Sequence, residues 1–166
     1  MEIKHYIPYI MTNLYDCGPC AMASALQIPL SEIKKEWQWK DYNSWKDDLK
    51  DSHWHHFVFL TNRKINFKLW TFDDLKNKKC TNEKTLILLH SLDHPYLSQH
   101  WAILKNVTNS EVEIHFGDNT DRRYTFDKFE KLVNTAWPNI IYTVNAGNEK
   151  ASSFAKFYVG FINSIL

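Results

Sequence analysis

Several features that organise other classes of protein are scarce or missing in this chain. It has three cysteines in 166 residues. So small and odd a number does not make a disulfide scaffold, and it favours a reducing compartment. Internal repeats, low-complexity tracts and long linkers rich in glycine, serine or proline are also missing from the sequence. Because nothing marks a domain boundary, we expect a single domain over residues 1–166.

Long apolar runs and an excess of one charge are missing as well. No stretch approaches the roughly 20 apolar residues that a membrane-spanning helix needs, and the start of the chain lacks the apolar region of a signal peptide. The formal net charge is +1, and no block of lysine and arginine alternates with aromatic residues. We therefore expect a soluble chain, cytoplasmic as encoded, without a membrane span or a nucleic-acid partner.

The chain does have enough apolar residues for one substantial core, since 44% are hydrophobic and 15% aromatic. Residues 17–60 have the pattern of helices, and the rest has that of strands with short helices between them. The expected helices include 29–39, 71–77 and 125–134, with a further C-terminal helix at about 150–166. The expected strands are 66–70, 86–89, 100–107, 111–116 and 139–144.

One cysteine stands at the start of a run of small residues that favours a helix. Asp16, Gly18 and Pro19 suit a turn and a first helical position, and residues 21–26 are good helix formers. A thiol at a helix start faces unpaired backbone N–H groups and the positive end of the helix dipole, which both favour the thiolate. Cys17 is therefore the candidate nucleophile, with a pKa expected below the roughly 8.5 of a free cysteine.

The same segment contains the pattern Cys17-Gly18-Pro19-Cys20, which is typical of thioredoxin-like dithiol oxidoreductases. In this alternative, Cys20 is the redox partner of Cys17. The residues before Cys17 form a polar loop rather than a buried strand, which disfavours the alternative. A disulfide between the two cysteines would still block the nucleophile reversibly, so we expect activity to require reductant.

Cysteine acyl-transfer enzymes also need a base and a residue that orients it. His100 opens a short apolar run that predicts a buried strand, and a second strand ends just before Asp118 and Asn119. In an antiparallel hairpin the start of the first strand lies beside the end of the second. His90 and His94 stand in the preceding loop as other candidates for the base. His100 is preferred because it opens the strand.

These motifs resemble those of the C39-like branch of the papain-like cysteine peptidases, which includes the bacteriocin-processing peptidases. The shared features are an Asp-Cys-Gly-Pro helix start, a His-Trp-hydrophobic strand and a later strand that ends in Asp. They cover about residues 7–142. The resemblance implies Cys17 as nucleophile, His100 as general base and Asp118 as the residue that orients the imidazole. It also implies an α+β fold in which a helical lobe carrying the Cys packs on an antiparallel sheet lobe carrying the His and the Asp.

Two positions depart from the family pattern. The family usually has a glutamine several residues before the cysteine that contributes to the oxyanion hole, and here the amide of that segment is Asn13. Asn119 stands where proline is common, which makes it an alternative to Asp118 as the orienting residue. Asn13 and Asn119 are thus the two further candidate site residues.

The expected function is that of a cysteine-dependent hydrolase that cleaves amide or peptide bonds through a thioester. Deamidases, transglutaminase-like enzymes and acyltransferases share this intermediate and stay open as alternatives, as does a non-catalytic papain-like binding module. The substrate would be a protein or peptide. A short chain of this kind suits a bacterial effector or toxin domain that another system delivers, with an inhibitory or immunity protein as partner.

No cofactor or metal is expected. The tract His53-Trp54-His55-His56 has the composition of a metal site, but histidines this close together cannot all face one ion on a helix. No set of cysteines or carboxylates accompanies them.

Overall fold

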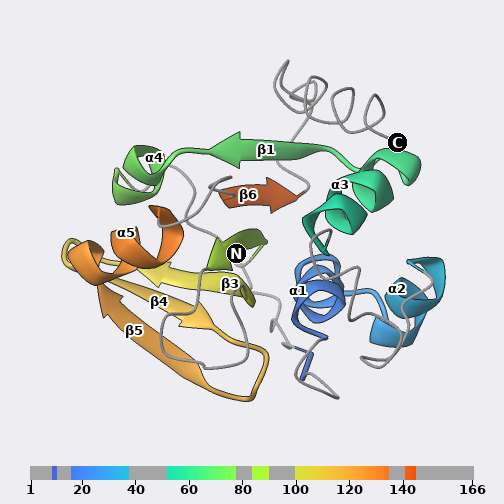
Figure 1. Ribbon diagram of the computed structural model, residues 1–166, viewed down its shortest axis with the longest axis horizontal. Coiled ribbons are helices and arrows are strands. Elements are labelled where there is room, and N and C mark those ends of the chain that lie inside the picture. The colour runs from blue at the N-terminus through green and yellow to red at the C-terminus, as the bar shows by residue number, and fades with distance from the viewer. Residues whose placement is uncertain are drawn as a thin grey trace, which may run out of the picture.

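The computed structural model describes residues 9–10, 16–37, 52–77, 84–89, 100–134 and 141–144. Three helices, α1 to α3, lie together on one side of Figure 1, and the strands with α4 and α5 make up the other. The elements are α1 (Cys17–Leu26), α2 (Leu30–Glu36), α3 (Ser52–Asn62), β1 (Phe67–Trp70), α4 (Phe72–Lys76), β2 (Thr85–Leu89), β3 (His100–Val107), β4 (Glu111–His115), β5 (Asp121–Thr125), α5 (Phe126–Asn134) and β6 (Ile141–Val144).

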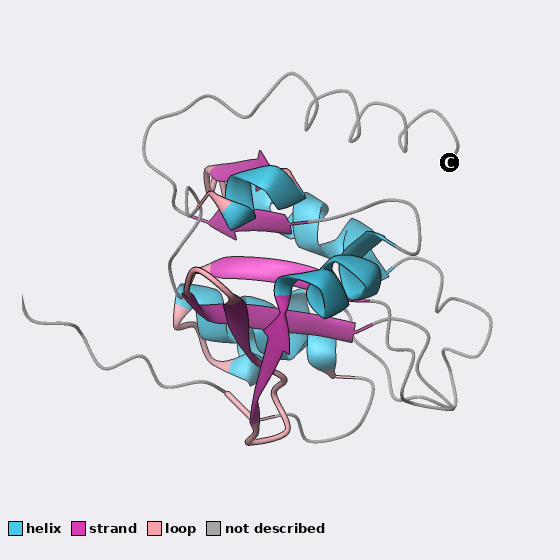
Figure 2. Cartoon of the chain, turned by 90° about the vertical axis from the view of Figure 1, so that its left-hand side faces the viewer, coloured by secondary structure: helices cyan, strands magenta, loops and turns pink. Residues whose placement is uncertain are grey.

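The strands form one six-stranded sheet in the order β1-β6-β2-β3-β4-β5, with antiparallel pairing between all neighbours. Its central strands are buried on both faces. Leu86 and Leu88 face the core beneath α1 and α3, whereas Ile87 and Leu89 face a second core with α4 and α5. This is why residues 86–89 form a continuous apolar run rather than an alternating one. Figure 2 shows helices on both faces of the sheet.

The structure confirms a mixed fold of helices and antiparallel sheet, and it adds one strand that the pattern did not predict. β5 carries Asp121, Arg122 and Arg123 and is largely exposed. As the edge of the sheet it packs one row of neighbours only, and its charged side chains suit an edge. The sequence of such a strand lacks the alternation of apolar and polar residues from which strands are predicted.

The helix that carries the candidate nucleophile is almost wholly buried. Residues 18–25 of α1 are all buried, because their small side chains let the helix backbone approach β3 closely. Gly18 lies in a tight place: a Cβ at this position would lie 3.3 Å from Nε2 of His56, whose ring would have to shift slightly, and 3.5 Å from Cδ1 of Trp101. α1 ends at Gln27 with a left-handed φ of 56°.

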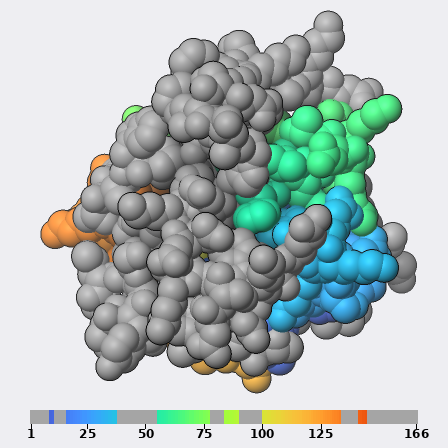
Figure 3. Space-filling model, turned by 45° about the vertical axis from the view of Figure 1, so that its right-hand side comes forward, coloured from blue at the N-terminus to red at the C-terminus, as the bar shows by residue number. Residues whose placement is uncertain are grey.

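α2 and α3 form an adjoining surface, seen in blue and green in Figure 3. Arg63, just after α3, joins them by donating to Glu32 at 2.6 Å and to Glu36 at 2.6 Å. The expected helix over 71–77 is confirmed as α4, whose Thr71 cap and Asp74 form a reciprocal capping box. The described residues contain no helix long and apolar enough to cross a membrane. The expected helix at 150–166 lies outside the described residues.

Candidate functional site

Cys17 is the first residue of α1 and is partly buried. Asp16 precedes it but does not cap the helix, because its carboxylate turns to Lys34 of α2 at 2.5 Å. The backbone N–H groups of Gly18 and of Cys17 itself favour the thiolate form of the sulfur. The backbone N–H of Trp101 on β3 favours the thiolate as well, and Cys17 and Trp101 line the same hollow.

The expectation of a lowered pKa for Cys17 is wrong for the resting protein. Burial raises the pKa of the Cys17 thiol, and the nearby charge of Asp16 adds to this. The N–H groups of Trp101 and Gly18 favour the thiolate but do not outweigh the loss of solvation. The thiol is thus protonated at neutral pH, and a base has to remove its proton.

His100 is the first residue of β3 and is only 3% exposed. Its Nε2 lies 2.7 Å from the backbone carbonyl oxygen of Phe116. Since a carbonyl only accepts, Nε2 carries the proton, and in the neutral ring the basic nitrogen is Nδ1. The imidazole also stacks on the Phe116 ring, with centroids 4.5 Å apart and planes 13° apart. Both contacts fix the orientation of the ring.

Asp118 makes its contacts with its own turn and with the start of β5. Its carboxylate accepts from the backbone N–H of Thr120 at 3.1 Å, from the Thr120 hydroxyl and from Arg122 at 2.8 Å. β4 ends at His115, and the chain then turns through Gly117 with φ 78° and Asn119 with φ 64°. This turn directs the carboxylate to Arg122, while the carbonyl of Phe116 bonds Nε2 of His100.

Asp118 is nevertheless connected to His100 through a short series of contacts. The Arg122 guanidinium that binds Asp118 lies over the Phe116 ring, 3.9 Å from its centroid. Phe116 in turn stacks on His100 and supplies the carbonyl that accepts from Nε2. The order of contacts is therefore carboxylate, guanidinium, phenyl ring and imidazole.

Cys20 is buried one turn after Cys17. Its thiol donates to the carbonyl oxygen of Tyr9 at 2.9 Å, and the Ser24 hydroxyl accepts from the Tyr9 N–H at 2.9 Å. Burial raises the pKa of Cys20 to about 12. Cys17 and Cys20 are both free thiols. Cys20 therefore holds the segment at Tyr9 against α1, and its role as a redox partner stays a prediction.

Two histidines of the 53–56 tract take part in core packing. His56 is fully buried, stacks on Trp101 with centroids 3.9 Å apart and contacts the Tyr142 hydroxyl. His55 stacks on Trp37. Within the described ranges no three His, Cys, Asp or Glu side chains gather as a metal site would require.

A histidine that the sequence analysis did not single out lies in the wall of a hollow beside α1. His115, the last residue of β4, is 5% exposed, and its Nδ1 lies 2.9 Å from Oδ1 of Asp121. The two residues are opposite each other in the β4–β5 ladder. This pairing could be predicted from the sequence only if residues 121–125 were recognised as a strand beside β4. Asn13, His90 and His94 lie outside the described residues.

No protein-family model and no curated protein matches the sequence. Solved structures do match the fold. One is the crystal structure of the peptidase domain of Streptococcus ComA, a bi-functional ABC transporter involved in a quorum-sensing pathway. It superposes with a TM-score of 0.54 at 13% identity, over 84% of this chain and 98% of that domain. The likeness shows that the two proteins share an α+β fold. In this chain the helix that begins at Cys17 packs on the antiparallel sheet.

Proposed function

We propose that the chain is a cysteine-dependent hydrolase of amide or peptide bonds, with Cys17 as nucleophile and His100 as general base. The observation that carries this proposal is that Cys17 and Trp101, the residue that follows His100, line the same hollow. Cys17 and Trp101 lie far apart in the sequence, and the backbone N–H of Trp101 favours the thiolate of Cys17. The likeness to a peptidase domain supports the same assignment.

The chemistry follows from the protonation states. Because burial keeps the Cys17 thiol protonated, Nδ1 of His100 has to take its proton as the sulfur attacks the substrate carbonyl. The negative oxygen that forms would accept from the backbone N–H groups at the start of α1. His100 then gives its proton to the leaving amine, which leaves a thioester on Cys17, and water releases the acyl group.

We assign the orienting contact on His100 to the backbone carbonyl of Phe116. It accepts from Nε2 at 2.7 Å and so selects the tautomer in which Nδ1 is the base. Asp118 acts in this proposal as a positioning residue, through its bond to Arg122 and the packing of Arg122 on Phe116. Asn119 gives the turn its left-handed residue.

Deamidation and acyl transfer to an amine use the same thioester and differ in the group that attacks it. We propose that water attacks the thioester and that the substrate is a protein or peptide. The effector or toxin role and the immunity partner remain predictions from the sequence.

The test is covalent labelling with a library of peptidyl acyloxymethyl ketones, followed by mapping of the labelled cysteine by mass spectrometry. We expect label on Cys17 in the wild type and in Cys20→Ala. His100→Gln should lower the labelling rate by about 10²-fold or more, the range of a lost general base. Preferential label on Cys20 or Cys80, or an unchanged rate in His100→Gln, would contradict the proposal.

A further inference from the structure

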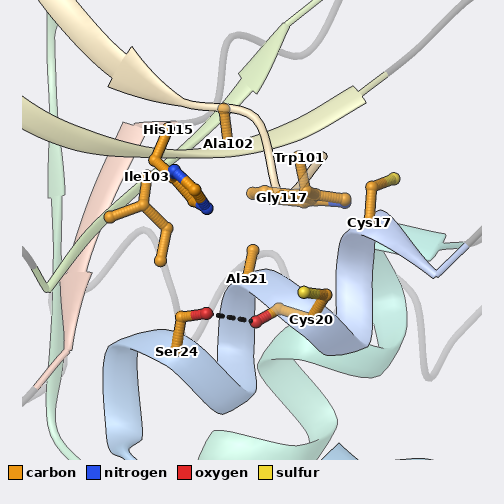
Figure 4. A pocket seen from close by; sticks show the side chains of 9 residues that line it. All are labelled: Cys17, Cys20, Ala21, Ser24, Trp101, Ala102, Ile103, His115 and Gly117. Atoms are coloured by element: carbon orange, nitrogen blue, oxygen red, sulfur yellow. Dashed lines mark hydrogen bonds between the residues drawn. The ribbon is translucent and has the colours of Figure 1, made fainter. Parts of the chain in front are cut away.

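A narrow hollow runs along α1 from the candidate nucleophile. One wall is the face of α1 from Cys17 to Ser24, and the other is formed by residues 101–103 of β3 with Gly117 and His115. Figure 4 shows the His115 ring entering it from β4, with Cys17 at the opposite end. The empty space is about 180 Å³ when the open solvent at the mouth is included, and the enclosed part has room for one group about the size of a water molecule.

His115 presents one unpartnered nitrogen to this hollow. Its Nδ1 faces the Asp121 carboxylate, which only accepts, so Nδ1 carries the proton and Nε2 of the neutral ring has the lone pair. Among the residues that the structure describes, Nε2 is buried and has no hydrogen-bond partner. Leaving such a buried atom without a hydrogen bond is unfavourable, because it has lost its bond to water and gained no other. An orphan of this kind points to a group that the hollow receives.

The charges around His115 indicate the chemical class of the group that binds there. Asp121 also binds Lys105, so the carboxylate is balanced by an ammonium group. The rest of the lining is mostly apolar or small, as at Ala21 and Gly117. An uncharged ligand therefore suits the hollow better than an ion. Because Nε2 accepts, the ligand has to donate a hydrogen bond.

We propose that this hollow, which we call the His115 subsite, binds the hydroxyl of a serine side chain of the substrate, with His115 Nε2 as acceptor. The inference rests on the proposed function, since it takes Cys17 at the other end of the hollow as the nucleophile. Serine fits because its side chain is one carbon longer than that of glycine and ends in a neutral donor. The enclosed part of the hollow has room for about one water-sized group, so the hydroxyl is the group that enters it.

The first test measures binding without turnover. The full chain, labelled with ¹⁵N-histidine, is titrated with N-acetyl-serine methylamide and, as the isosteric control, N-acetyl-aminobutyrate methylamide. We expect the serine compound to move the His115 Nε2 resonance in a saturable way and the control to leave it in place. His115→Gln identifies the resonance. An Nε2 signal that responds to neither compound, or equally to both, overturns the subsite.

The second test uses Cys17 as the reporter. Chloromethyl ketones built on acetyl-serine and acetyl-aminobutyrate are compared by their rate of Cys17 alkylation, corrected for their reactivity with glutathione. We expect a preference of roughly two- to tenfold for the serine probe, the worth of one hydrogen bond. His115→Phe should abolish it and His115→Gln should keep part of it. A preference that persists in His115→Phe overturns the subsite. If Cys17 reacts with neither probe, the proposed function fails, and the resonance titration still decides the subsite.

Discussion

At the sulfur of Cys17, burial and helix position act against each other. The N–H groups of Gly18 and Trp101 favour the thiolate, and desolvation favours the thiol. Desolvation has the larger effect, so the pKa is raised. A helix start lowers the pKa of a cysteine only when the sulfur stays solvated enough for its neighbours to dominate.

Alkylation of Cys17 should therefore have an unusual pH dependence. A raised pKa means a smaller thiolate fraction at pH 7 than in a free cysteine. The rate with iodoacetamide should thus be low at pH 7 and keep rising with pH after that of N-acetylcysteine has levelled off. Mass spectrometry of Cys17 from pH 6 to 10 checks this. A profile that levels off below pH 8 would contradict it.

Replacing Cys20 separates the structural role from the redox role. In Cys20→Ala the bond to the Tyr9 carbonyl is lost, and stability should fall by about 1 kcal/mol. Labelling of Cys17 should continue, and mild oxidation should no longer inhibit it reversibly. Urea unfolding and labelling before and after oxidant measure both effects. An unchanged oxidant response rejects the disulfide, and loss of all activity would revive the dithiol alternative.

At the scale of elements, the turn between β4 and β5 decides which group orients His100. The β4 strand ends at His115, so the carbonyl of Phe116 stays beside β3 while the Asp118 side chain follows the turn. The edge strand β5 then returns Arg122 over Phe116. The turn and the edge strand thus hold the Phe116 ring, which stacks on His100, the proposed base.

Arg122→Ala should loosen this arrangement without unfolding the sheet. Losing the guanidinium over Phe116 removes about 0.5–1 kcal/mol of cation–π attraction, and we expect Cys17 labelling to slow by roughly two- to fivefold. The ¹⁵N resonances of His100 should shift toward a mixture of tautomers. Arg123→Ala is the matched control, because the neighbouring Arg123 pairs with Glu113 instead. Equal effects in both variants would exclude the positioning role.

At the scale of the whole molecule, the sheet separates two cores, one beneath α1 and α3 and one beneath α4 and α5. The candidate site lies where α1 of the first core meets β3 and the end of β4. A carboxylate in the turn between β4 and β5, beside this site, also contributes to the stability of the whole fold. The pKa of Asp118 is lowered: burial alone would raise it, but Thr120 and Arg122 outweigh burial.

Stability should consequently decline in acid, with a contribution from Asp118. A carboxyl with a lowered folded-state pKa stabilises the fold fully above its unfolded pKa of about 3.9, and the contribution is lost as the pH falls through the folded value. Asp118→Asn should lower the urea midpoint of unfolding at pH 7. The difference between the midpoints of the variant and the wild type should become smaller as the pH falls toward 3. A difference that is constant with pH would contradict this linkage.

Much of the architecture could be predicted from local pattern. The continuous apolar run at 86–89, the strands opened by His100 and Glu111, and the capped helix after Thr71 follow from periodicity and capping, which are properties of neighbouring residues. The small residues after Cys17 likewise specified a helix that can approach a sheet closely. Because these signals are local, the sequence alone determined the order of the described elements except for β5, and it identified the candidate nucleophile and base.

The environment of the site was decided only by the tertiary structure. Strand pairing places His115 opposite Asp121 and aims its Nε2 along α1. The turn after β4 gives Nε2 of His100 the Phe116 carbonyl. Packing against β3 raises the pKa of Cys17, although its position at a helix start favours a lower one. Desolvation, register and turn direction depend on residues distant in sequence, so no local pattern contains them.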